Sequence, residues 1–282
     1  MNILNAIILG IIQGLSEFIP ISSTAHLTIA GKFFGLINAE HPEEWTAFIA
    51  VLQLGTVAAI LLFFRIKIWT ILRSFCREVL LERRGFSSAS HDTKLGWFVI
   101  IGTLPVVTIG IALKKIIESS LTKNLWLIAI NLIVFALILA MAERFSKHIR
   151  SMEKISLRDA IAIGSAQVFA LFPGASRSGV TMSAGLFSGL TRETAAEFSF
   201  LLSIPAIVGS GLLELRASLQ QTHSFGGIET LMGIVTASIV GYASIWFLLQ
   251  YLKTHSNVLF IWYRIALGII ICGLLFSSII PA

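Results

Sequence analysis

Six long apolar runs constrain this chain more than any other feature of its sequence. They cover about 45–64, 95–113, 125–142, 198–215, 228–252 and 259–280. A helix needs roughly 20 apolar residues to cross the hydrocarbon core of a bilayer, and each run is of that order. The runs are apolar on all sides, whereas the strands of a membrane β-barrel alternate every second residue. The sequence therefore predicts an all-α polytopic membrane protein with six transmembrane helices.

Two further apolar regions are interrupted by polar residues. Region 3–36 is broken at 13–23, and region 159–190 is broken at 173–179. Each half has about 10–14 residues, or roughly 15–20 Å of helix, which is about half the thickness of a bilayer. Irregular backbone at membrane depth is tolerated where it is buried in protein or lines an aqueous cavity. We therefore expect two re-entrant helical hairpins, one at 3–36 and one at 159–190.

Basic residues predict the orientation in the membrane. Segment 65–94 holds seven Lys and Arg residues and segment 143–158 holds five, whereas 31–44 and 216–227 hold one each. Cytoplasmic loops are enriched in these residues, so we expect the first two segments inside and both termini outside. The formal net charge of +6 then reflects topology. The basic residues form no stripe with interleaved aromatics of the kind that indicates nucleic-acid binding, so no nucleic-acid partner is expected.

A weak internal repeat links the two interrupted regions. Gly10, Gln13, Phe18 and Ser22 recur 154 positions later as Gly164, Gln167, Phe172 and Ser176. The two copies are expected to have opposite orientations, which is typical of an inverted-topology repeat. We expect one membrane domain over 1–282, with a first repeat at about 1–142 and a second at about 156–282. Whether the paired glutamines serve packing or a site is left open by the sequence.

The two breaks carry residues suited to an anionic ligand. Serine and threonine are favoured helix caps, and they begin the second half of each hairpin at Ser22, Ser23, Thr24, Ser176 and Ser178. Helix N-termini present unpaired N–H groups and a positive dipole end. Gly174 and Gly179 are expected to let the backbone approach a ligand, and the planar guanidinium of Arg177 suits phosphate oxygens. The pattern predicts a phosphate site where the breaks meet.

Acid–base groups lie beside these caps. A carboxylate inside a membrane costs about 2.5–3.5 kcal/mol, so Glu17 requires Arg177, a metal ion or a water-filled cavity. His26 follows Ser23 by three residues and Ser22 by four, so the three share one helix face. Serine, imidazole and carboxylate can supply a nucleophile, a base and an orienting group. The alternative is that the hydroxyls only cap helices and His26 packs at an interface.

One further charge falls inside an apolar run. Arg264 lies near the end of the last predicted span. Long basic side chains near helix ends usually extend their charge to the membrane surface. We expect Arg264 to do the same.

These motifs resemble those of the undecaprenyl-diphosphate phosphatases of the bacitracin-resistance type. The family's first motif has the form Glu-Gly-x-Thr-Glu-Phe-x-Pro-Val-Ser-Ser-Thr-Gly-His, and residues 13–26 read QGLSEFIPISSTAH. Its second motif, Pro-Gly-x-Ser-Arg-Ser-Gly-x-Thr, resembles residues 173–181, which read PGASRSGVT. The resemblance covers nearly the whole chain. It implies hydrolysis of undecaprenyl diphosphate to the monophosphate at the outer face of the bacterial inner membrane, which recycles the lipid carrier for peptidoglycan and other envelope polymers.

The resemblance also implies roles for single residues. Ser23 and His26 would be nucleophile and base, Glu17 would assist a metal ion or water, and Arg177 would bind the diphosphate. A divalent cation, Mg²⁺ or Ca²⁺, is expected, with Glu17 as its candidate ligand. The residues expected to contact or support the substrate are Gln13, Ser22, Thr24, Gly174, Ser176, Ser178, Gly179 and Thr181.

Three positions depart from the family pattern. The first glutamate of the motif is Gln13 here, an acidic position in the following span corresponds to Ile49, and the glycine before the histidine is Ala25. The loss of two carboxylates predicts weaker metal binding, and a divergent paralogue of low or altered activity is one alternative. A lipid-phosphate transporter or flippase is another, because broken helices in inverted repeats are a transporter architecture. The expected partners are the polyprenyl diphosphate and membrane lipid, and a homodimer is compatible with the sequence.

Overall fold

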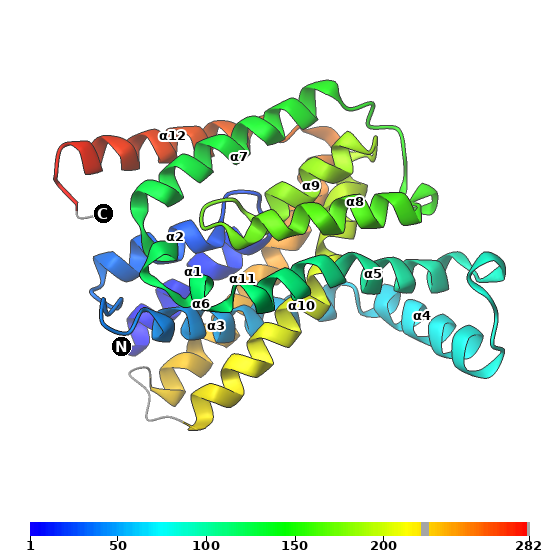
Figure 1. The fold of residues 1–282 in the computed structure, drawn as a ribbon, viewed down its shortest axis with the longest axis horizontal. Helices are drawn as coiled ribbons and strands as arrows, with labels where there is room; N and C mark the ends of the chain where they lie inside the picture. The colour runs from blue at the N-terminus through cyan, green and yellow to red at the C-terminus, as the bar shows by residue number, and fades with distance from the viewer. Residues whose placement is uncertain (221–225, 281–282) are drawn as a thin grey trace.

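The computed structural model describes residues 1–220 and 226–280. Residues 221–225, in the predicted loop 216–227, and residues 281–282, at the end of the predicted second repeat, lie outside the described residues. The described chain is built of helices (Figure 1). The α-helices are α1 Ile3–Phe18, α2 Ser23–Phe33, α3 Pro42–Phe63, α4 Arg65–Phe75, α5 His91–Ala112, α6 Lys114–Glu118, α7 Leu125–Phe145, α8 Leu157–Gln167, α9 Arg177–Phe187, α10 Arg192–Gln220, α11 Gly227–Thr254 and α12 Val258–Phe276. The shorter helical turns are η1 Cys76–Leu81, η2 Phe86–Ser88, η3 Ser120–Lys123, η4 Met152–Lys154 and η5 Val168–Leu171.

Among the described residues, six helices are long and apolar enough to cross a membrane. They are α3, α5, α7, α10, α11 and α12. The prediction of six spans is confirmed, and the chain is a multi-pass membrane protein. The largest difference at a start is α10, which begins at Arg192 and not at 198. A hydroxyl cap explains this start, because the Thr191 hydroxyl accepts a 3.2 Å bond from the Thr194 N–H and so begins the helix in its polar segment.

The two interrupted regions form two helix–break–helix pairs, α1–α2 and α8–α9, but the bounds of both breaks differ from the predicted ones. Helix α1 continues through residues 13–18, so Gln13 and Glu17 are helical and only 19–22 lie outside. Pro20 stops the helix because the residue before a proline disfavours the α conformation. In the second pair, α9 begins at Arg177, so residues 177–179 are its first turn. Polar composition alone overestimated the first break and misplaced the second, because α8 already ends at Gln167 and the turn η5 follows it.

The second helix of each pair begins with the same unusual backbone conformation. Ser22 has φ 76° and ψ 97°, and Ser176 has φ 70° and ψ 110°. Positive φ is uncommon for residues other than glycine. Each serine hydroxyl accepts a bond from the N–H three residues on, at 3.3 Å from Ala25 and 3.2 Å from Gly179. The caps predicted at Ser22 and Ser176 are confirmed, and the two helix starts share one local structure.

The helix pairs pack in a reciprocal way. Helix α1 packs along α11 and α8 packs along α5, while α3 packs on α10 and α7 on α12. Small residues at these contacts let backbones approach closely, as is typical of membrane helices. A Cβ atom added to Gly14 would lie 2.8 Å from the Gly241 nitrogen, and one added to Gly164 would overlap the Gly102 carbonyl. Helix α1 is thus held by late elements of the chain and α8 by early ones.

The chain termini and the predicted basic loops lie at different ends of the molecule. Figure 1 shows both termini at one end of the molecule. Helix α4 and the connection between α7 and α8 lie at the opposite end. These two segments fall within the Lys- and Arg-rich stretches 65–94 and 143–158. The termini and the basic segments are therefore on opposite sides.

Candidate functional site

Glu17 connects the two breaks through its carboxylate. Its Oε1 accepts a 2.8 Å hydrogen bond from Arg177 Nη2. Its Oε2 accepts a 2.6 Å bond from the Ser23 hydroxyl and a 3.0 Å bond from Gln13 Nε2. The Glu17 side chain is 3% exposed and the Arg177 side chain 14%, so this ion pair is largely withdrawn from solvent. The structure therefore joins a hydroxyl, a carboxylate and a guanidinium, as the sequence predicted.

Arg264 holds the two breaks together from behind. Its Nη2 donates bonds of 3.0 and 2.8 Å to the carbonyls of Gly174 and Ala175, and its Nη1 donates a 3.4 Å bond to the carbonyl of Pro20. The residue is fully buried. The prediction that Arg264 extends to the membrane surface was wrong. These irregular segments offer carbonyls with no helical partner, and a guanidinium fork can satisfy several of them at once.

A cavity of about 430 Å³ lies against the Glu17–Arg177 pair. Four predicted site residues line it, namely Glu17, Ser23, Thr24 and Arg177. Ile49, at one of the departures from the family pattern, also lines it. Much of the remaining wall is apolar and comes from α5, α10 and the segment before α9, including Val106, Ile111, Ala170, Leu171, Ala206, Ile207 and Leu213. The cavity therefore joins a charged end to an apolar wall.

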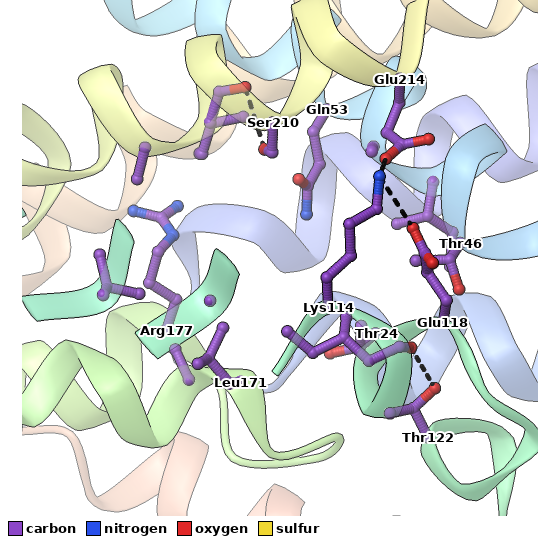
Figure 2. Close-up of a pocket in the computed structure, with 18 of the residues that line it drawn as sticks. Thr24, Thr46, Gln53, Lys114, Glu118, Thr122, Leu171, Arg177, Ser210 and Glu214 are labelled. Atoms are coloured by element: carbon purple, nitrogen blue, oxygen red, sulfur yellow. Dashed lines mark hydrogen bonds and ion pairs between the residues drawn. The ribbon is translucent and has the colours of Figure 1, made fainter. Parts of the chain in front are cut away.

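The far end of the cavity carries a second group of charges. Lys114 Nζ lies 3.3 Å from Glu118 and 3.6 Å from Glu214. Figure 2 shows this cluster on the opposite side of the cavity from Arg177, with Gln53 between them. Lys123 lies nearby and donates to the carbonyls of residues 117–119. Burial lowers the pKa of the Lys123 ammonium to about 8.

The ring nitrogens of His26 are hydrogen-bonded to groups other than Ser23. Its Nδ1 lies 2.8 Å from the Ser22 carbonyl and its Nε2 lies 2.7 Å from the Tyr263 hydroxyl. Since a carbonyl can only accept, Nδ1 donates, and the Nε2 of the neutral ring accepts from Tyr263. The two rings also stack, with centroids 5.6 Å apart. The structure thus gives the Ser23 proton a carboxylate acceptor, Glu17, and not the imidazole that the sequence suggested.

Several other predicted residues lie behind the cavity wall. The Ser178 hydroxyl is fully buried and donates to the Ile19 carbonyl at 3.4 Å. The Thr181 hydroxyl donates to the Arg177 carbonyl at 2.8 Å. Gly174 and Gly179 pack against protein, because an added Cβ would lie 2.5 Å from the Ile128 carbonyl and 2.7 Å from Arg264 Nη1 respectively. These glycines allow helices to approach, which corrects the expectation that they make room for a ligand.

Sequence reasoning left one residue around this site open, Gln167, and missed two others, Tyr263 and Arg264. Gln167 lines the cavity, and only the weak repeat pointed to it. Tyr263 holds His26, and no pattern in an aromatic-rich span distinguishes it. The position of Arg264 within an apolar run could have indicated a role in the site, because a charge in such a run is usually functional. Its neighbours, however, come from distant segments of the chain. All three depend on tertiary contacts.

Unpartnered polar atoms and the scarcity of carboxylates define what the site can bind. Arg177 Nη1 and both amide atoms of Gln167 are buried without a hydrogen-bond partner. Over residues 1–220 and 226–280, no group of three or more His, Cys, Asp or Glu side chains could hold a metal ion. A carboxylate has about four acceptor positions, and Glu17 uses three of them. The site thus offers free donors for an anion and one carboxylate position for a cation.

Residues 6–270 match the family described as bacitracin resistance protein BacA. The chain belongs to the BacA family. An undecaprenyl-diphosphatase of Syntrophobacter fumaroxidans is 53% identical to it over 95% of both chains. Undecaprenyl-diphosphatases of Nocardioides sp. and Chlorobium phaeobacteroides are 43% and 44% identical over 100% of both chains. The resemblance seen in the two motifs is confirmed, and it extends over residues 6–270 of the chain.

Proposed function

We propose that this protein is a phosphatase that hydrolyses undecaprenyl diphosphate to undecaprenyl phosphate and inorganic phosphate. One observation carries the proposal: Glu17 joins the Ser23 hydroxyl and the Arg177 guanidinium at the charged end of a cavity whose wall is largely apolar. A lipid diphosphate has a matching polar head and apolar tail. The names of the relatives in the BacA family support the same substrate.

The two helix–break–helix pairs form re-entrant hairpins in an inverted repeat. Three observations support this arrangement. The pairs are too short to span a bilayer twice, with 11 residues in α2, α8 and α9 and 16 in α1. Ser22 and Ser176 share one strained cap geometry. The packing of α1 on α11 mirrors that of α8 on α5, as a pseudo-twofold axis in the membrane plane requires.

The protein lies in the bacterial inner membrane with both termini outside. The Lys- and Arg-rich segments lie at the end opposite the termini (Figure 1), and such segments are retained in the cytoplasm. The cavity extends from Glu17 to Lys114 and Glu214, at the ends of α5 and α10 that face away from the basic segments. The site therefore opens towards the outer face.

Ser23 is the nucleophile and Glu17 is its base. The Ser23 oxygen bonds to the terminal phosphorus while its proton passes to Glu17, which lies 2.6 Å away. The bond from that phosphorus to the bridging oxygen breaks, and undecaprenyl phosphate leaves. Water then attacks the phosphoserine, Ser23 recovers its proton from Glu17, and the remaining water proton leaves with inorganic phosphate. Attack by a water activated by His26 is less well supported, because His26 Nε2 is bonded to Tyr263.

Arg177 stabilises the charge of the transferred group. Its Nη2 is held by Glu17, which leaves Nη1 as a buried donor without a protein partner. Donors fixed before the reaction stabilise developing charge without reorganisation. The pairing with Glu17 therefore orients the Arg177 guanidinium and also neutralises its charge.

A divalent cation would assist this reaction. Glu17 is the residue that would hold it, through its remaining acceptor position, together with oxygens of the diphosphate, since Mg²⁺ is often bound by one or two carboxylates plus substrate phosphates. The cation would supply neutralisation of phosphate charge. Gln13 donates to Glu17 and adds no carboxylate, which supports a cation bound mainly through the substrate.

Phosphate release by the purified protein tests the function. Undecaprenyl diphosphate and the shorter farnesyl diphosphate serve as substrates, with Ser23→Ala as the inactive reference and Ser210→Ala as a matched control. Ser210 lines the same cavity, but its hydroxyl donates to the Ile207 carbonyl of its own helix. Release of phosphate by the wild type and the control alone is the expected result. A flippase would instead move lipid phosphate across vesicles with no release of phosphate.

A further inference from the structure

Gln167 is buried in the cavity wall without any hydrogen-bond partner. It is the last residue of α8 and is fully withdrawn from solvent. Neither its amide nitrogen nor its amide oxygen has a partner, yet the residue lines the cavity that contains Glu17 and Arg177. Buried amides are nearly always hydrogen-bonded, because leaving one unpaired is costly. The unpaired nitrogen and oxygen of this amide therefore indicate a ligand in the cavity that bonds to them.

Comparison with the equivalent glutamine indicates the kind of ligand. Gln13 lies 154 positions before Gln167 and donates from Nε2 to Glu17, one helical turn further on. The position that corresponds to Glu17 in the second repeat is Leu171, which also lines the cavity. Leucine offers no acceptor. The anionic oxygen that Gln13 finds in its own helix is thus missing at Gln167, although the donor remains.

A second free donor lines the same cavity. Arg177 Nη1 has no partner, and its sister Nη2 is bonded to Glu17. Gln167, Arg177 and Ser23 all line this cavity. Two hydrogen-bond donors that line one cavity and have no acceptor in the protein are suited to a ligand that carries several anionic oxygens.

We infer that Gln167 is a substrate-binding residue whose amide N–H donates to a nonbridging phosphate oxygen of the diphosphate. This inference rests on the proposed function. The amide oxygen, which cannot bond to phosphate oxygens without a proton, holds a water beside the phosphate. Gln167 thus completes with Arg177 a set of donors contributed by the second repeat, whereas Ser23 and Glu17 come from the first.

Replacement by a side chain of similar shape separates binding from stability. Gln167→Met removes both polar atoms and keeps most of the volume. Since the side chain of Gln167 makes no hydrogen bond within the protein, the thermal unfolding temperature of Gln167→Met is expected to be equal to or above that of the wild type. The KM for farnesyl diphosphate is expected to rise about 10-fold, which is the effect of losing one hydrogen bond to a charged group. Gln167→Glu places a negative charge towards the phosphate and is expected to raise KM further.

The control is Arg158→Ala, because Arg158 is exposed and is not among the residues that line the cavity. The KM of this variant is expected to match that of the wild type. An unchanged KM in Gln167→Met would overturn the inference, and so would a lower unfolding temperature accompanied by a proportional loss of folded, active protein. Wild-type protein assayed in parallel distinguishes failure of the proposed function from failure of the role assigned to Gln167. If the wild type releases no phosphate, the proposed function fails; if it does and Gln167→Met matches it, only the role of Gln167 fails.

Discussion

Arg177 Nη2 lies 2.8 Å from Glu17 Oε1, which joins two side chains that are 160 positions apart in the sequence. Glu17 lies in the last turn of the first helix of one pair, and Arg177 begins the second helix of the other. A carboxylate inside a membrane protein is costly unless it is paired. This bond therefore holds the two breaks adjacent, and it fixes in place the carboxylate that accepts the hydrogen bond of the Ser23 hydroxyl.

Arg177→Lys is expected to lower kcat about 100-fold, the effect of losing one fixed donor to the transition state. Lysine keeps the charge but cannot bond Glu17 and phosphate with two donors of one planar group. Phosphate release under saturating substrate measures the effect. Arg158→Lys is the control, since Arg158 is exposed. Turnover of Arg177→Lys near the wild-type value would reject the assigned role.

Ser23→Ala and Glu17→Gln are expected to reduce kcat by about 100-fold or more, because proton transfer by a positioned base contributes at least that factor. His26→Gln and Tyr263→Phe are expected to reduce it about 10-fold or less, because these residues are bonded to each other and act by positioning helix α2. The four variants are compared in one phosphate-release assay. A loss in His26→Gln as large as that in Ser23→Ala would transfer the role of base to His26.

Removal of divalent cations by EDTA is expected to lower the wild-type rate, and excess Mg²⁺ is expected to restore it. With Glu17 as the candidate carboxylate ligand, the apparent affinity for Mg²⁺ should increase with substrate concentration, because the diphosphate supplies most of the ligands. The residual activity of Glu17→Gln should respond little to either treatment. Equal wild-type rates with and without EDTA would remove the cation from the proposal.

Arg264→Met is expected to lower both the unfolding temperature and kcat. The carbonyls of Gly174 and Ala175 would lose their donor, and a buried group left unpaired costs about 1–3 kcal/mol. The two breaks would also lose their shared anchor, which shifts Glu17 relative to Arg177. Thermal unfolding in detergent and phosphate release measure the two effects, with Arg158→Met as control. Wild-type stability and turnover in Arg264→Met would show that the anchor is dispensable.

Gly164→Ala is expected to destabilise the protein by about 1–3 kcal/mol, the usual cost of overpacking. The added methyl group would overlap the Gly102 carbonyl of α5. Gly273→Ala is the matched control, because this helical glycine has nothing within 4 Å of an added Cβ and alanine is the better helix former. Chemical or thermal unfolding compares the two. Equal stability of both variants would argue against close packing of α8 on α5.

The sequence alone determined the spans and the start of each second helix. Apolar runs partition into lipid one segment at a time, so their positions can be read without knowledge of the fold. Caps such as Ser22 and Ser176 and the stop at Pro20 act on neighbouring backbone groups, so they are also local. Composition was less informative where packing overrides it: residues 13–18 look like a polar break but are helical, because Gly14 lets α1 approach α11.

Only the tertiary structure decided which groups meet. Spacing placed His26 on the face of Ser23, but the fold brings Tyr263 to His26 and Glu17 to Ser23. The sequence is compatible with Arg264 at a membrane surface and with Arg264 between the two breaks. The fold places it between Pro20 and Gly174. Hydrogen bonds and ion pairs act over a few ångströms, so the choice of partners is set by how the helices pack and not by the pattern of the chain.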